Sequence, residues 1–190
     1  MRTAAEVEEL LLSEVPPDRR LRVFAALLGA ASGLGTSGLT VVGDSAIEIY
    51  INGAYVSGDI DLVAADPDKV RQVLRAWGFR DEGKLWTHSK LGLYVDLVGR
   101  FNSGSNRLTR VVQTEYGSVK LGAIEDLIVK RLLETRYWGQ KAALAQAILL
   151  TREYGADLDW DYIRFFSERD GLDDLVAEMR RRSGLVRNAR

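Results

Sequence analysis

The spacing of apolar residues changes near residue 123, and this change divides the chain into two parts. Before it, short apolar runs alternate with helix-like segments, and after it apolar residues recur with the 3.6-residue period of an α-helix. We therefore expect an α/β (α+β) protein. Residues 1–121 should form a mixed sheet flanked by helices, including N-terminal helices, and residues 122–190 a C-terminal helical bundle.

Local patterns predict individual elements in both parts. Helices are expected over residues 4–12, 18–31, from 46 onward, 66–77, 123–137, 140–154, 159–169 and 171–183. Strands are expected over residues 39–42, 59–63, 85–86, 91–98, 109–113 and 116–120. The glycine- and serine-rich residues 33–38 are expected to form a flexible connection.

The composition excludes several kinds of chemistry. Cysteine is absent and His88 is the single histidine. The chain therefore cannot hold a disulfide, a zinc–thiolate site or a cysteine nucleophile, and a histidine-built metal site is not expected. Its chemistry must come from carboxylates, lysines, arginines, hydroxyls and backbone amides. His88 itself is expected on the surface of a hairpin.

Charge and hydropathy narrow the range of partners. The chain has 26 basic and 27 acidic residues, which argues against a protein that coats nucleic acid. Its apolar stretches are shorter than the roughly 20 residues of a membrane span. The acidic N-terminus does not resemble a signal peptide. The sequence predicts a soluble, cytoplasmic protein without a membrane partner.

Three carboxylates form a candidate metal site. Asp59 and Asp61 are two residues apart on an expected strand, so their side chains leave the same face and repel one another unless a cation lies between them. Mg²⁺ prefers such oxygen ligands. Asp96 lies within an apolar strand, where burial of a carboxylate is costly without compensation. Three carboxylates would suit a two-metal site, although Asp-x-Asp pairs also occur on solvated strands.

A short segment of small residues precedes the acidic strand. Gly43-Asp44-Ser45 lies between an expected strand and an expected helix, where small residues and helix amides can approach a phosphate. Ser45 and Glu48 match the capping-box pattern. Ser45 can therefore cap the helix only, or cap it and also present its hydroxyl to a terminal phosphate.

These segments resemble a known superfamily. Val41 to Ala46, followed by Ser57 to Val63, is similar to the paired motifs of the nucleotidyltransferase (polymerase beta-like) superfamily. More narrowly, the chain resembles small prokaryotic nucleotidyltransferases of abortive-infection and toxin–antitoxin systems. In that group the helical half begins with a segment like Glu125 to Leu132. The resemblance covers about residues 38–150.

The resemblance implies an enzyme that depends on Mg²⁺ or Mn²⁺. It would move a nucleoside monophosphate from an NTP such as ATP to a hydroxyl of a protein or an RNA, with release of pyrophosphate. A cognate toxin or antitoxin and a second copy of the chain are further partners that it leaves open. The implied catalytic and metal-binding residues are Asp59, Asp61 and Asp96, and the implied nucleotide-binding residues are Gly43, Ser45 and Lys130.

Two departures from the family pattern keep alternatives open. Asp44 stands where the family has a second glycine or a serine, and residues 139–143 lack the aspartate that related toxins often carry. A carboxylate beside a triphosphate is repulsive unless it turns away or binds metal or ribose. The alternatives are a catalytically weak binding or antitoxin module of the same fold, and a metal-dependent nuclease that uses the same acids.

Tryptophans and a basic run are candidates for RNA contact. Trp86 and Trp138 could stack on bases, whereas Trp77 and Trp160 are expected in the core. The arginines at 180–182 either contact RNA or form an ordinary solvated helix end.

Overall fold

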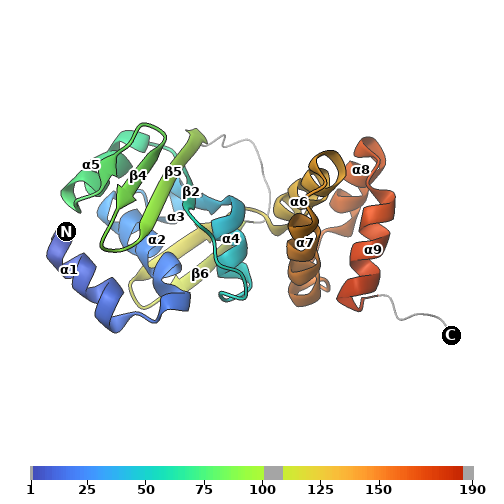
Figure 1. Ribbon diagram of the computed structural model, residues 1–190, viewed down its shortest axis with the longest axis horizontal. Helices are drawn as coiled ribbons and strands as arrows, with labels where there is room; N and C mark the ends of the chain where they lie inside the picture. The colour runs from blue at the N-terminus through green and yellow to red at the C-terminus, as the bar shows by residue number, and fades with distance from the viewer. Residues whose placement is uncertain (1, 101–108, 186–190) are drawn as a thin grey trace. The chain divides into compact units, whose positions relative to one another are not determined.

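The computed structural model describes residues 2–100 and 109–185. The chain divides into two compact units, Met1–Gly122 and Ala123–Arg190 (Figure 1). This division lies one residue after the expected boundary. Each unit is described by itself below.

The first unit is built on a mixed sheet of seven strands in its described residues, in the order β3-β4-β5-β2-β1-β7-β6. β1 pairs in parallel with β7, and β2 pairs in parallel with β5, whereas all other neighbours are antiparallel. The strands are Leu39–Val42 (β1), Ile60–Ala64 (β2), Arg80–Asp81 (β3), Leu85–His88 (β4), Leu93–Arg100 (β5), Arg110–Thr114 (β6) and Gly117–Leu121 (β7).

Strict alternation of side chains gives this sheet two different faces. Val41, Leu62 and Leu121 are register partners on adjacent strands, and each is almost completely buried. They share one apolar face because paired residues point to the same side of a sheet. Asp61 and Asp96 are also register partners. Because Asp61 is one residue before Leu62 on the same strand, the two aspartates lie on the opposite face.

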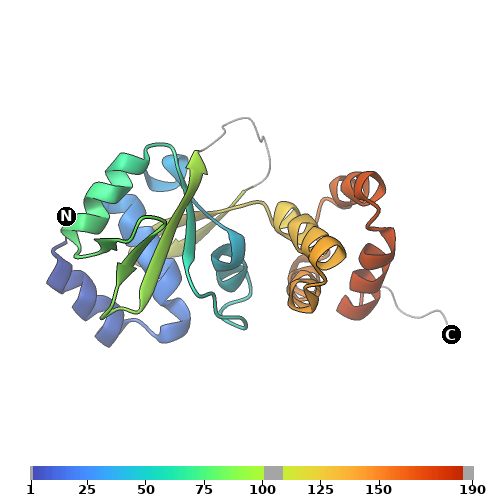
Figure 2. The same cartoon turned by 45° about the horizontal axis from the view of Figure 1, so that its top comes forward.

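Helices pack against this sheet (Figure 2). Those that pack on its strands are Arg20–Ala31 (α2), Gly35–Gly38 (α3), Gly43–Tyr50 (α4) and Pro67–Ala76 (α5). The unit also contains Ala4–Glu9 (α1), a π-helix at Leu10–Glu14 (η1) and a 3₁₀ turn at Pro17–Arg19 (η2). α2 is the central helix of the unit: Phe24 and Leu28 are fully buried, and α2 contacts β7, α4 and α5.

Two segments differ from the sequence prediction. The helix expected over residues 4–12 ends as an α-helix at Glu9, because the chain continues with the wider turns of η1, in which Val15 N donates to Leu10 O. Residues 35–38, expected as part of a flexible connection, form the helical turn α3. Ala65 N donates to Gly38 O at 2.7 Å and ties this turn to the chain after β2.

The second unit is helical throughout its described residues outside short connections. Its helices are Ile124–Trp138 (α6), Lys141–Tyr154 (α7), Trp160–Asp170 (α8) and Asp173–Ser183 (α9). α6 packs on α7 and α8, and α9 packs on α7. Glu125 Oε1 accepts a hydrogen bond from Asp159 N at 3.0 Å and holds the start of α8 to the start of α6.

Aromatic residues and the histidine are placed differently from some expectations. Trp77 is buried as predicted, with its Nε1 donating to Arg2 O, and Trp160 is half-buried. Trp86 is 3% exposed and packs beneath Arg75, so it presents no free ring to a base, whereas Trp138 is 70% exposed. His88 is buried against Phe79 rather than lying on a hairpin surface.

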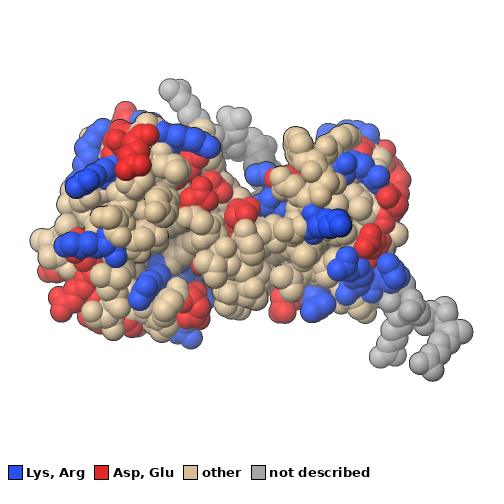
Figure 3. Space-filling view, viewed as in Figure 1, with Lys and Arg blue, Asp and Glu red and all other residues tan. Residues whose placement is uncertain are grey.

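Surface charge is mixed on both units. On the face shown in Figure 3, acidic and basic side chains are interspersed on each unit, in agreement with the formal net charge of −1. In the described parts of the chain, no helix is both long enough and apolar enough to cross a membrane.

Candidate active site

Two of the three predicted carboxylates are brought together by strand pairing. Asp61 on β2 and Asp96 on β5 are direct register partners in a parallel pair. Neighbouring strands lie about 4.8 Å apart, and paired residues point to the same face. Asp61 is half-buried and Asp96 is 8% exposed. The sheet therefore places two carboxylates side by side in a partly desolvated position.

Gly43 closes one side of this carboxylate pair. Its φ is +63°, which lies in the left-handed region that favours glycine. A Cβ built on Gly43 would overlap Oδ2 of Asp61. The backbone at the start of α4 thus packs directly against the Asp61 carboxylate, and a larger residue would displace it.

Ser45 joins the strand before it to the acidic strand. Its side chain is fully buried, its Oγ donates to Val42 O at 2.8 Å, and the same Oγ accepts from Asp61 N at 3.1 Å. The capping-box prediction is wrong, because α4 begins at Gly43 with Val42 as its N-cap, so Ser45 lies inside the helix. The phosphate-binding role of Ser45 stays a prediction.

Glu48 holds the loop that leads to the acidic strand. This glutamate, expected to cap α4, is instead 6% exposed, and its Oε2 accepts from Ser57 N at 2.5 Å. Burial raises the pKa of the Glu48 carboxyl, although the hydrogen bond from Ser57 acts in the opposite direction. The buried acid fixes the position at which the chain turns toward Asp59.

Asp59 precedes β2 instead of lying in it, since the strand begins at Ile60. Its backbone is held by Ser57, whose Oγ donates to Asp59 O at 2.5 Å. Asp59 is half-buried. Asp59 is thus two residues before Asp61 in the sequence but lies outside the strand ladder that pairs Asp61 with Asp96.

A lysine that the sequence analysis did not single out contacts the acidic pair. Lys84 Nζ lies 3.7 Å from Asp96 Oδ2. The Lys84 side chain is 85% exposed, whereas the Asp96 side chain is 12% exposed. An ion pair with one such exposed partner is weak, so Lys84 can be displaced from the carboxylate. No sequence motif indicates this contact, which follows from the β4–β5 pairing that places Leu85 opposite Asp96.

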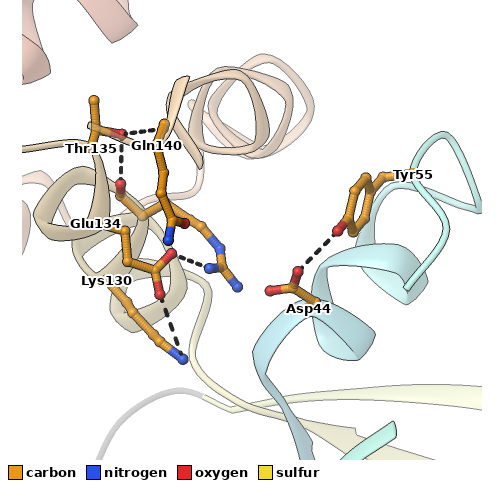
Figure 4. A network of polar contacts seen from close by, with 7 residues as sticks. Asp44, Tyr55, Lys130, Glu134, Thr135 and Gln140 are labelled. Atoms are coloured by element: carbon orange, nitrogen blue, oxygen red, sulfur yellow. Dashed lines mark hydrogen bonds and ion pairs between the residues drawn. The ribbon is translucent and has the colours of Figure 1, made fainter. Parts of the chain in front are cut away.

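Asp44 turns toward the loop after α4. Tyr55 Oη donates to Asp44 Oδ2 at 2.9 Å (Figure 4). Asp44 lies in the first turn of α4, where the helix dipole stabilises a carboxylate. Tyr55, which no motif indicated, therefore orients the residue that departs most clearly from the family pattern.

Lys130 belongs to the second unit. It lies on α6 with its side chain 58% exposed, and its Nζ is 3.9 Å from Glu134 Oε1 (Figure 4). Glu134 also forms an ion pair with the buried Arg131, and Thr135 Oγ1 donates to Arg131 O at 2.8 Å. The predicted contact of Lys130 with a nucleotide stays a prediction.

The donor chemistry of the acidic face suits a hard cation. Carboxylate oxygens from Asp61 and Asp96 are the ligands that Mg²⁺ and Mn²⁺ prefer. Over residues 2–100 and 109–185, however, no three His, Cys, Asp or Glu side chains are grouped so as to hold a metal ion. The face as folded offers two paired carboxylates, with Asp59 nearby in sequence as the third.

Comparisons with known proteins do not indicate a function for this site. No family model matches the chain. No curated protein and no solved structure matches it significantly either. The site is therefore interpreted from its own residues.

Proposed function

We propose that the chain is a Mg²⁺- or Mn²⁺-dependent nucleotidyltransferase, with a first unit of nucleotidyltransferase fold and a C-terminal helical bundle. The supporting observation is the register pairing of Asp61 with Asp96 beside the Gly43 backbone. Two carboxylates on adjacent parallel strands, next to the start of a helix, suit the transfer of a nucleotidyl group. The sequence resemblance supports the same proposal.

The proposed reaction moves a nucleoside monophosphate from an NTP to a hydroxyl of a protein or RNA. The acceptor oxygen forms a bond to the α-phosphorus, the bond to the bridging oxygen breaks, and pyrophosphate leaves. Asp59, Asp61 and Asp96 would hold the divalent ion, which when bound neutralises phosphate charge and favours loss of the acceptor proton. Gly43 and Ser45 would position the phosphates, and Lys130 would contact them.

The test is label transfer. The purified chain is incubated with each α-labelled NTP and Mg²⁺, alone and with cell lysate, and the label is followed into protein and RNA. Asp61→Asn and Asp96→Asn are expected to lower transfer by about 10²-fold or more. Asp68→Asn removes an 80% exposed carboxylate on α5 and should leave transfer unchanged. Transfer that survives in the Asp61 and Asp96 variants would contradict the proposal.

A second candidate is a catalytically weak binding or antitoxin module of the same fold. Two observations favour it: Lys84 supplies a protein cation to Asp96, and Asp44 places a carboxylate in the first turn of α4. Both weaken the case for a bound metal and triphosphate.

Thermal shift distinguishes the two candidates. Mg²⁺ together with an NTP should raise the melting temperature of an enzyme of this kind, and the shift should vanish in the double variant Asp59→Ala/Asp61→Ala. Absence of a shift with every NTP would favour the binding module.

A further inference from the structure

A polar groove in the first unit lies away from the acidic face, at the opposite end of α4. It has a volume of about 520 Å³, which falls in the range of small-molecule sites. Four segments contribute to it: the start of α2, the turn that follows α4, the end of β6 and the β6–β7 turn. Its described lining residues are Arg19, Arg22, Val23, Asn52, Gln113, Thr114 and Glu115.

The lining is rich in hydrogen-bond donors. Arg19 is exposed and, within residues 2–100 and 109–185, forms no ion pair. Arg22 lies one turn further along α2, so both guanidinium groups belong to the same side of the helix. Gln113 Oε1 accepts from Ser118 Oγ at 2.7 Å, which leaves the Nε2 hydrogens of Gln113 as donors. Guanidinium groups form the paired hydrogen bonds that phosphate oxygens accept.

Asn52 orients one of the two arginines. Its Oδ1 accepts from Arg22 Nη1 at 3.3 Å. Asn52 has a φ of +50° and is the one non-glycine residue with positive φ among the described residues. The left-handed region admits asparagine more readily than most other non-glycine residues, so the asparagine side chain is compatible with this backbone position. Its contact with Arg22 gives that side chain a role in the groove.

The carboxylate of Glu115 limits how many phosphoryl groups a ligand of the groove can carry. Among the described lining residues only Glu115 is acidic, against two arginines. The groove therefore has a net positive charge that suits a single phosphoryl group. A second phosphate would meet the carboxylate, whereas a hydroxyl could donate a hydrogen bond to it.

We propose that this groove binds a phosphomonoester that carries a hydroxyl group. Arg19, Arg22 and Gln113 bind the phosphoryl oxygens, Asn52 holds Arg22 in position, and Glu115 accepts from the hydroxyl. The site is independent of the nucleotidyltransferase proposal, since none of its residues belongs to the acidic face.

The test is a titration of the full chain followed by ¹H–¹⁵N NMR at constant ionic strength. EDTA is present throughout, so the result does not depend on metal binding at Asp61 and Asp96. Inorganic phosphate should shift the Asn52 side-chain amide and the Arg22 Nε–H signals saturably, whereas chloride should not. Ribose 5-phosphate should bind more tightly than inorganic phosphate. Pyrophosphate should not bind more tightly than ribose 5-phosphate. Tighter binding of pyrophosphate than of ribose 5-phosphate would overturn the assignment of Glu115.

Variants separate binding from folding. Arg22→Gln should weaken ribose 5-phosphate binding by about tenfold or more, because it removes a charged hydrogen bond. Asn52→Gly should also weaken binding while leaving the melting temperature unchanged or higher. Arg71→Gln, which removes an arginine of α5 paired with Asp68, is the matched control and should bind as the parent does. Equal shifts with chloride, or undiminished binding by Arg22→Gln, would overturn the site.

Discussion

The carboxylate of Asp61 packs against the Cα of Gly43, leaving no room for a side chain at residue 43. The contact joins the first residue of α4 to the second residue of β2. It depends on a backbone conformation that L-residues rarely adopt, with φ at +63°. A local steric requirement thus fixes one of the two paired carboxylates of the acidic face.

Gly43→Ala should lower the free energy of unfolding by about 2–4 kcal/mol, because it combines left-handed strain with overlap at Asp61. Gly58→Ala is the matched control. Gly58 lies in the loop just before Asp59, lacks a positive φ, and has open space where a Cβ would lie. Its variant should change stability by less than about 0.5 kcal/mol. Urea unfolding of both variants measures the difference, and equal effects would argue against the contact.

Ser45→Ala tests the buried hydroxyl between Val42 and Asp61. The variant removes the Ser45 Oγ that accepts from Asp61 N–H and should cost about 1–3 kcal/mol. Ser37→Ala removes an exposed hydroxyl that donates to Leu34 O and should be nearly neutral. Chemical denaturation compares the two. A neutral Ser45→Ala would show that water or another group replaces the hydroxyl.

Glu48 should make stability depend on pH. Burial raises its pKa in the folded state, so the folded protein binds the proton more tightly than the unfolded chain. Stability from this group is therefore fully present below the unfolded pKa and is lost as the pH rises through the raised folded pKa. Glu48→Gln keeps an acceptor for Ser57 N and should be more stable than the parent at pH 7, with a smaller difference at pH 4.

Thermal unfolding between pH 4 and pH 8 measures this difference. Glu9→Gln, an exposed change on α1, serves as control and should follow the parent profile. If the stability of the parent and of Glu48→Gln changed with pH in the same way, the raised pKa of Glu48 would be contradicted.

Much of the fold is predictable from local pattern, because periodicity and capping are local properties. The strand over residues 39–42 and the helices after residue 123 have nearly the predicted bounds. Alternation also indicates that Asp96 lies on a strand. Local pattern does not indicate that Asp61 lies beside Asp96. Their proximity depends on the parallel pairing of β2 with β5, which are separated along the chain.

The remaining differences also come from tertiary packing. Ser45 and Glu48 have the spacing of a capping box, but Gly43 extends α4 backward, and both side chains bind the segment before or within β2 instead. Lys84 carries no motif, and only the hairpin register brings it to Asp96. These contacts are set by how strands align, which composition does not specify.

Lys84→Gln should increase the affinity of the acidic face for Mg²⁺ or Mn²⁺. The ammonium group competes with a metal for Asp96, and an exposed pair of this kind contributes less than about 1 kcal/mol, so the gain is up to about fivefold. Lys69→Gln breaks an ion pair of the same 3.7 Å length, with Asp66, and should leave metal affinity unchanged. Titration of Mn²⁺ by electron paramagnetic resonance gives both affinities. A loss of affinity in Lys84→Gln would mean that the lysine assists the site.

His88→Ala should destabilise the first unit, because both ring nitrogens of the buried imidazole have polar neighbours. Nδ1 accepts from Leu91 N at 3.3 Å, and Nε2 lies 3.3 Å from Glu8 Oε1 on α1. The ring also packs edge-on against Phe79. Loss of these contacts from a buried position should cost about 2–4 kcal/mol.

Thr87→Ala, the neighbouring change on β4, removes a hydroxyl that donates to Glu82 at an exposed position and should cost less than about 1 kcal/mol. Because His88 connects β4 to α1, hydrogen exchange should speed up in α1 of His88→Ala and not of Thr87→Ala, and unchanged exchange there would contradict the connection.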